Sequence, residues 1–117
     1  MPTRADVLAI RSIEEAFDLS TVAIRPSEVT LIRVALSEGL IVYTLHALDA
    51  QEDEMIPDGA VDRVIESGRP ASKDIHPMGP RQQGINFEGR IRGPRTIRVK
   101  VSWDDCYYIP TVHTIES

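Results

Sequence analysis

The segment Thr96-Ile97-Arg98-Val99-Lys100-Val101-Ser102-Trp103 has the most regular pattern in the chain. Apolar side chains occupy every second position from Ile97 to Trp103, and polar side chains lie between them. Successive side chains of a β-strand point to opposite faces of the sheet. The alternation therefore predicts a strand with one face in the core and the other towards solvent.

The segments on either side extend this strand into a sheet. Ile85–Arg92 alternates in the same way and is joined to Thr96–Trp103 by a Gly93-Pro94 turn. Asp104-Asp105 predicts the next turn, and Cys106–Ile115 the last strand, whose Pro110 is typical of a sheet edge. These strands predict an antiparallel meander.

The first two thirds of the chain predict mainly helices. Pro26 suits a helix start, Gly39 suits a helix end, and Thr44 and Asp58 suit the N-cap position of two further helices. The expected elements are helices over Asp6–Asp18, Pro26–Glu38, Thr44 to about Glu54 and Asp58–Gly68, a strand over Leu40–Thr44, and a long loop over Arg69–Gly84. The fold class is therefore α+β, with N-terminal helices followed by a three- to four-stranded antiparallel sheet.

Length and composition set limits on the class of protein. A chain of 117 residues suits a single domain, and one cysteine, Cys106, allows no intrachain disulfide. No signal peptide or membrane-spanning run is recognisable, so we expect a cytoplasmic protein without a membrane partner. The net charge of −5 counts against a generic nucleic-acid binder. However, residues 1–60 carry 4 Lys/Arg against 11 Asp/Glu, whereas residues 69–100 carry 8 against 2.

The polar face of the expected sheet could cleave RNA. It would present Asn86, Glu88, Arg90, Arg92, Arg98 and Lys100, and His113 would join it if the strand register allows. A carboxylate or a histidine can take the proton of the 2′-hydroxyl group, a second group can protonate the leaving oxygen, and cations can stabilise the phosphorane. Charged residues on the solvent side of a sheet are also ordinary, so the pattern alone leaves both interpretations open. Three histidines without paired spacing predict no metal site, and we expect no cofactor.

The order of several motifs resembles a known family. The motifs are Tyr43-Thr44-Leu45-His46-Ala47-Leu48-Asp49, the following helix that ends at Gly68, the hairpin around Gly89-Arg90, and strands like Ile97–Val101 and Ile109–Val112. In this order they resemble small bacterial proteins related to the BrnT and RelE toxins of the barnase–colicin–RelE ribonuclease superfamily. The resemblance covers residues 40–115 of a single domain, 1–117. Residues 1–39 would be a helical addition that could form a homodimer.

This resemblance implies a metal-independent endoribonuclease of a toxin–antitoxin system, with RNA and a cognate antitoxin protein as partners. It assigns catalytic roles to His46 and Arg90, and the strand-face argument adds Glu88 and His113. Members commonly carry arginines where this chain has Ala50 and Glu54, which moves phosphate binding onto other cations. The expected RNA-binding residues are Arg81, Arg92, Arg98 and Lys100.

Two other hypotheses compete with the ribonuclease. The first is a non-catalytic protein-interaction module on the same fold, which would bind its partner through the acidic helix end Gln51–Glu54 and the N-terminal helices. The second is a ligand-binding or regulatory domain that uses the segment Arg69–Gly84, although no pattern there identifies a ligand.

Overall fold

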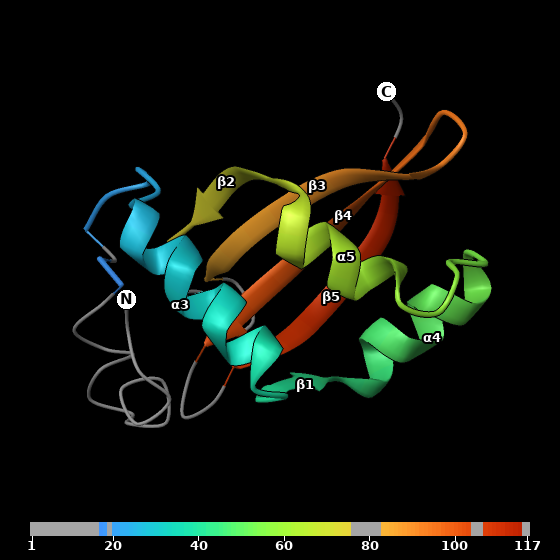
Figure 1. Ribbon diagram of the computed structural model, residues 1–117, viewed down its shortest axis with the longest axis horizontal. Coiled ribbons are helices and arrows are strands. Elements are labelled where there is room, and N and C mark those ends of the chain that lie inside the picture. The colour runs from blue at the N-terminus through green and yellow to red at the C-terminus, as the bar shows by residue number, and fades with distance from the viewer. Residues whose placement is uncertain (1–16, 19, 76–82, 104–106, 116–117) are drawn as a thin grey trace.

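The computed structural model describes residues 17–18, 20–75, 83–103 and 107–115. These residues form an α+β fold with a five-stranded mixed sheet in the order β1-β5-β4-β3-β2 (Figure 1). The elements are α3 (Pro26–Ser37), β1 (Ile41–Tyr43), α4 (Leu45–Asp53), α5 (Ala60–Ser67), β2 (Arg69–Asp74), β3 (Gly84–Arg92), β4 (Arg95–Trp103) and β5 (Tyr107–Ile115). The α+β class is confirmed, but the sheet is larger than expected and is not purely antiparallel.

The helices cover one face of the sheet. Figure 1 shows α3 and α5 in front of the strands, and α5 packs against β3 and β4. The core between these layers contains Ile85, Phe87, Ile97, Val99 and Val101, all fully buried. The prediction that the apolar side chains of β4 face the core is therefore confirmed. The polar residues of β3 and β4 alternate with them and lie on the opposite face. No helix of the described residues is long and apolar enough to cross a membrane.

Several predicted helix ends are confirmed. Pro26 begins α3, and Gly39 follows it with a φ of 71°. The Thr44 hydroxyl caps α4 by accepting a hydrogen bond from the amide of Ala47, at 3.1 Å. The predicted cap of α5 is wrong, because Gly59, with a φ of 79°, takes the N-cap position instead of Asp58. The predicted helix over Asp6–Asp18 lies almost wholly outside the described residues.

The segment Arg69–Gly84 was expected to be a loop, and this prediction is wrong for its first part. Arg69–Asp74 forms β2, which pairs antiparallel with β3 and makes one edge of the sheet. Lys73 explains why a polar sequence forms a strand here. Its ammonium group points into the core side and forms a buried ion pair with Glu28 of α3, at 2.7 Å.

The last strand was expected at an edge, which is also wrong. β5 lies between β4 and β1, and β1 pairs with it in parallel from Ile41↔Tyr107 to Tyr43↔Ile109. Beyond β1, α4 flanks β5: the carboxylate of Glu54 accepts the amide of Thr114 at 2.7 Å. Pro110 is tolerated in this strand because it lies at a bulge, where Ile109 and Pro110 together oppose Val101.

The close approach of α5 to β3 requires a glycine at the end of the helix. A Cβ atom on Gly68 would lie 2.3 Å from the Val64 carbonyl oxygen and 2.8 Å from that of Glu88. Both atoms belong to the backbone, so neither can move away without displacing its element. We expect Gly68→Ala to lower the free energy of unfolding by about 1–3 kcal/mol, as measured by urea denaturation.

The neighbouring substitution Ser67→Ala is the control for this prediction. It removes one exposed hydrogen bond, from the Ser67 hydroxyl to the Arg63 carbonyl, and should change stability by less than about 1 kcal/mol. Equal stability of Gly68→Ala and wild type would contradict the close packing of α5 on β3.

Candidate functional site on the open sheet face

Four ionisable side chains form a row across the open face of the sheet. Arg69 of β2 opposes Glu88 of β3, Glu88 opposes Arg98 of β4, and Arg98 opposes His113 of β5. Side chains at directly opposed positions of antiparallel strands lie on the same face, about 4.5–5.5 Å apart at their Cβ atoms. The row therefore places a carboxylate, two guanidinium groups and an imidazole side by side.

Glu88 is the central residue of this row. Its carboxylate forms ion pairs with Arg69 at 3.1 Å and with Arg98 at 2.6 Å, and Arg98 Nε donates to the same oxygen at 2.8 Å. The Glu88 side chain is 13% exposed, and that of Arg98 is 39% exposed. The carboxylate is thus held in a fixed orientation, and most of the Glu88 side chain is shielded from solvent.

His113 lies beside Arg98 without a fixed partner. Its side chain is partly buried, and it forms no hydrogen bond or ion pair within the part of the chain that the structure describes. Its position depends on the bulge in β5. Extending the pairing Trp103↔Tyr107 without the bulge would put Val112 opposite Arg98, whereas the bulge shifts β5 by one residue and brings His113 there.

A second polar row runs parallel to the first. Ser72, Asn86, Lys100 and Thr111 occupy opposed positions on the same four strands. The Asn86 amide donates to Ser72 Oγ at 3.0 Å and to Asp74 Oδ2 at 2.8 Å, and Lys100 pairs with Asp74 at 3.0 Å. Burial alone would raise the pKa of Asp74, but the hydrogen bonds from Asn86 and Lys100 outweigh it and the pKa is lowered.

The predicted site residues are only partly brought together. Glu88, Arg98, Lys100 and His113 share the open face. His46 is exposed on α4, and no hydrogen bond or ion pair joins its side chain to either row among the described residues. Arg92 is exposed at the β3–β4 hairpin, and Arg81 lies outside the described residues.

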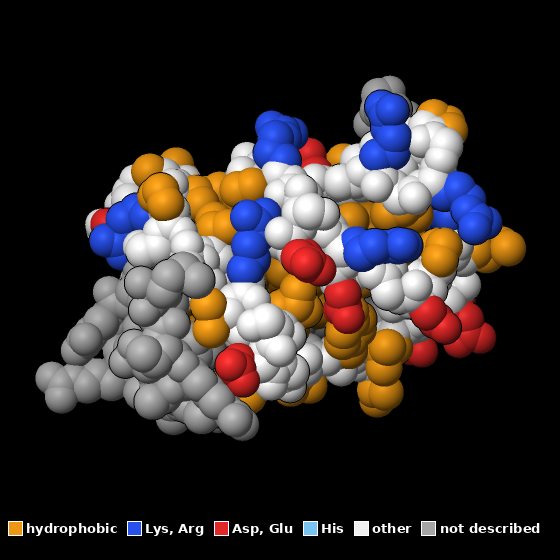
Figure 2. Space-filling view, viewed as in Figure 1, with side chains coloured by type: hydrophobic (Ala, Val, Ile, Leu, Met, Phe, Trp, Pro, Cys, Tyr) orange, Lys and Arg blue, Asp and Glu red, His pale blue; other side chains and the backbone are white. Residues whose placement is uncertain are grey.

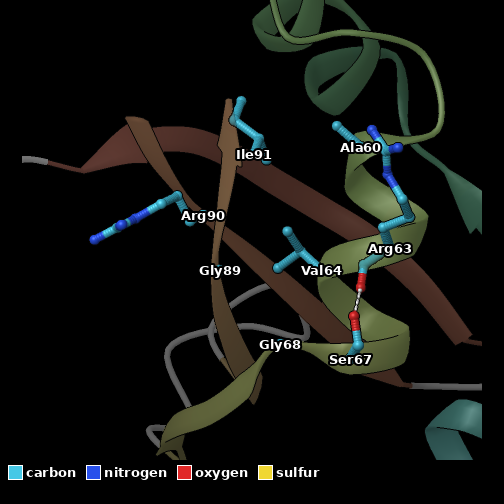
Figure 3. Close-up of a pocket in the computed structure, with 8 residues that line it drawn as sticks. All are labelled: Ala60, Arg63, Val64, Ser67, Gly68, Gly89, Arg90 and Ile91. Atoms are coloured by element: carbon cyan, nitrogen blue, oxygen red, sulfur yellow. Dashed lines mark hydrogen bonds between the residues drawn. The ribbon is translucent and has the colours of Figure 1, made fainter. Parts of the chain in front are cut away.

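Arg90 lies one position further along the same face, opposite Thr96. It also borders a groove of about 310 Å³ between α5 and β3, where Val64 and Gly89 lie close together. Figure 3 shows that Arg90 points away from α5, whereas Arg63 runs along the helix. The two cations of this groove therefore diverge, and they do not form a joint anion site there.

Sequence reasoning missed the residues that β2 contributes to the face. Arg69 binds Glu88. Ser72 accepts a hydrogen bond from Asn86, and Asp74 binds both Asn86 and Lys100. Most of the prolines and glycines that predict a loop in Arg69–Gly84 lie after Asp74. The sequence therefore allowed a short strand to be predicted before them.

The arrangement suits proton transfer next to an anion more than metal binding. A carboxylate oxygen, an imidazole and several cations lie on one exposed surface, which is the set needed for acid–base chemistry at a phosphate ester. Among the described residues, no group of three or more His, Cys, Asp or Glu side chains could hold a metal ion.

Comparison with known proteins adds no relative to this description: no family model, no curated protein and no solved structure matches the chain.

Proposed function

We propose that the protein is a metal-independent endoribonuclease, of the kind found as toxins in bacterial toxin–antitoxin systems, and that its active site is the row Glu88-Arg98-His113. The observation that carries the proposal is the pairing register, which aligns these three side chains on neighbouring strands. The resemblance to the BrnT and RelE toxins is part of the proposal and rests on the sequence motifs alone.

The reaction would be an internal transesterification of RNA. Glu88 takes the proton of a 2′-hydroxyl group, whose oxygen attacks the adjacent phosphorus atom. His113, in its protonated form, gives a proton to the departing 5′-oxygen. The products are a 2′,3′-cyclic phosphate and a free 5′-hydroxyl group. General acid–base catalysis of this type contributes about 10²–10⁴-fold to a rate.

The cations would act on the phosphorane. Arg98 holds the Glu88 carboxylate and lies next to His113, so it can reach a phosphate bound between them. Lys100 is the neighbouring residue of the same β4 face and is held near this position by Asp74. Each preorganised donor in such a site is worth roughly 2–4 kcal/mol of transition-state stabilisation.

The test uses the purified full chain and a labelled RNA oligonucleotide in the presence of a metal chelator. We expect cleavage with 2′,3′-cyclic phosphate ends and no cleavage of the matching DNA oligonucleotide, which lacks the 2′-hydroxyl group. Arg98→Ala should lower the rate by about 10²–10³-fold. An Arg63→Ala variant, which removes an exposed cation of α5 on the helix side of the sheet, serves as the matched cation control.

Expression in bacteria tests the toxin part of the proposal separately. Tightly repressed induction of the wild type should arrest growth and degrade cellular RNA, and Arg98→Ala or Arg90→Ala should relieve both effects. Normal growth and intact RNA, together with abundant folded protein and no cleavage in vitro, would refute the ribonuclease. An antitoxin partner would be expected to cover the Arg98 face with acidic side chains.

A further inference from the structure

The exposed side of α4 carries apolar side chains where a soluble helix normally carries polar ones. Leu45 is 79% exposed and Leu48 is 45% exposed, and Met55, just beyond the end of the helix, is 81% exposed. Leu45 and Leu48 are three residues apart, so they lie on one side of the helix, and Met55 follows the C-cap Glu54. We call Leu45, Leu48 and Met55 the α4 ridge. Figure 2 shows apolar side chains protruding at the lower edge and right end of the molecule, where Figure 1 places α4.

A groove runs beside this ridge. It has a volume of about 340 Å³ and is lined by Leu48, Gln51, Glu52, Ile56 and Asp58. Ile56 is only 5% exposed and belongs to the core. The groove therefore offers an apolar side wall, next to carboxylates at its rim.

Met55 is held in an unfavourable backbone conformation. Its φ is 54°, the only positive value at a non-glycine position among the described residues. Glycine or asparagine is the usual residue at such a helix end, because side chains strain the left-handed region. Strain of this kind, about 1–3 kcal/mol, is typical of positions kept for a function. Here the strained residue holds a flexible apolar side chain in solvent.

The charges that α4 and its flanking segments contribute around the ridge are negative, and one cation from β4, Arg95, lies at the Met55 end, where it donates to the carbonyl oxygens of Glu54 and Met55. Between Arg33 and Arg63 the chain has no lysine or arginine, but it has seven carboxylates: Glu38, Asp49, Glu52, Asp53, Glu54, Asp58 and Asp62. The side-chain carboxylates of Asp49, Glu52, Asp53 and Asp58 form no ion pair or hydrogen bond within the described part of the chain. Their charges are thus available to a cationic partner.

We infer that the α4 ridge and its groove are a docking surface for a basic amphipathic segment of a partner protein. Apolar side chains of that segment would pack against Leu45, Leu48 and Met55, and its lysines or arginines would meet Glu52, Asp53 and Asp58. Interfaces of this type combine a small apolar centre with a polar rim, and charge complementarity selects the partner. The surface uses no residue of the Glu88-Arg98-His113 row, and the inference holds whether or not that row cleaves RNA.

The first experiment uses the full chain and a fluorescent synthetic amphipathic peptide made of leucine and lysine. A peptide of the same pattern made of leucine and glutamate is the matched control for charge. We expect saturable binding of the lysine peptide by fluorescence anisotropy, and a roughly tenfold or greater loss of affinity in the double variant Leu45→Ser/Leu48→Ser. Val22→Ser, which changes another exposed apolar residue, should leave the affinity unchanged.

A second variant separates docking from a structural role. Met55→Gly relieves the positive φ, so it should raise the midpoint of urea denaturation and at the same time weaken peptide binding several-fold. Equal binding of the glutamate peptide, or unchanged binding in both ridge variants, would overturn the inference. Self-association of the wild type that the Leu45→Ser/Leu48→Ser variant abolishes would also overturn it, because the occupant would then be a second copy of the chain.

Discussion

Glu88→Gln and His113→Ala are each expected to lower the rate of RNA cleavage by about 10²–10⁴-fold. Glutamine keeps the shape of Glu88 but cannot accept the 2′-hydroxyl proton, and alanine removes the only side chain of β5 in the row. The double variant should be little slower than the worse single variant, because acid and base act in one step. The measurement is single-turnover cleavage of a labelled RNA oligonucleotide.

Matched controls distinguish this site from the one that the sequence resemblance implies. Glu66→Gln changes an exposed glutamate on α5, on the other side of the sheet, and should cleave like wild type. His46→Ala should also cleave within about threefold of wild type, because catalytic contributions of acid–base groups need hydrogen-bond reach of the substrate. If His46→Ala abolished cleavage and His113→Ala did not, the active site would lie at α4 and the proposed row would be wrong.

The elements that could be predicted from the sequence are those whose signals are local. β4 follows from its period of two, and α3 follows from Pro26 and Gly39 at its ends. Thr44 caps α4 as expected, because a threonine hydroxyl can accept from an amide three residues ahead. Each of these signals is contained within about a dozen neighbouring residues.

The elements that were missed depend on partners far away in the chain. β2 is polar and contains Pro70, and it is a strand because β3 lies beside it and because Lys73 reaches Glu28, 45 residues earlier. The interior position of β5 depends on β1, which pairs with it in parallel although more than half of the chain lies between the two strands. Neither partnership leaves a periodic pattern in the sequence.

The same limit applies to the candidate site. Glu88 and Arg98 could be placed on one face, because a short turn joins their strands and fixes the register. His113 could not, because one extra residue at Ile109-Pro110 decides whether position 112 or 113 opposes Arg98. Arg69 could not be assigned to this face, because the strand that carries it, β2, was not predicted.

The buried pair Lys73–Glu28 leads to the largest stability effect that we predict. Both side chains are fully buried, and their charged atoms are 2.7 Å apart. The Lys73 ammonium group also donates to the carbonyl oxygens of Asp18 and Ala23, at 2.6 and 3.2 Å. The Glu28 carboxylate accepts the backbone amides of Asp18 and Arg25, at 3.0 and 2.7 Å. This one pair therefore joins the segment before α3, α3 itself and β2.

Lys73→Met is expected to lower the free energy of unfolding by about 3–5 kcal/mol, because it leaves the Glu28 carboxylate buried without its counter-charge. Such a loss is a large part of the 5–15 kcal/mol that holds a typical domain together. Urea denaturation followed by the fluorescence of Trp103, the only tryptophan, measures it, since Trp103 is buried and stacks on Phe17 at 3.8 Å.

A double-mutant cycle separates the pair from the other contacts of its members. Glu28→Gln alone should also be strongly destabilising, and Glu28→Gln/Lys73→Met should be more stable than the sum of the single losses predicts, because no charge then remains buried alone. Arg69→Ala breaks a neighbouring ion pair of β2 whose arginine side chain is 74% exposed, and it should cost less than about 1 kcal/mol. Additive losses in the cycle, or equal losses in Lys73→Met and Arg69→Ala, would show that the ion pair does not hold β2 to α3.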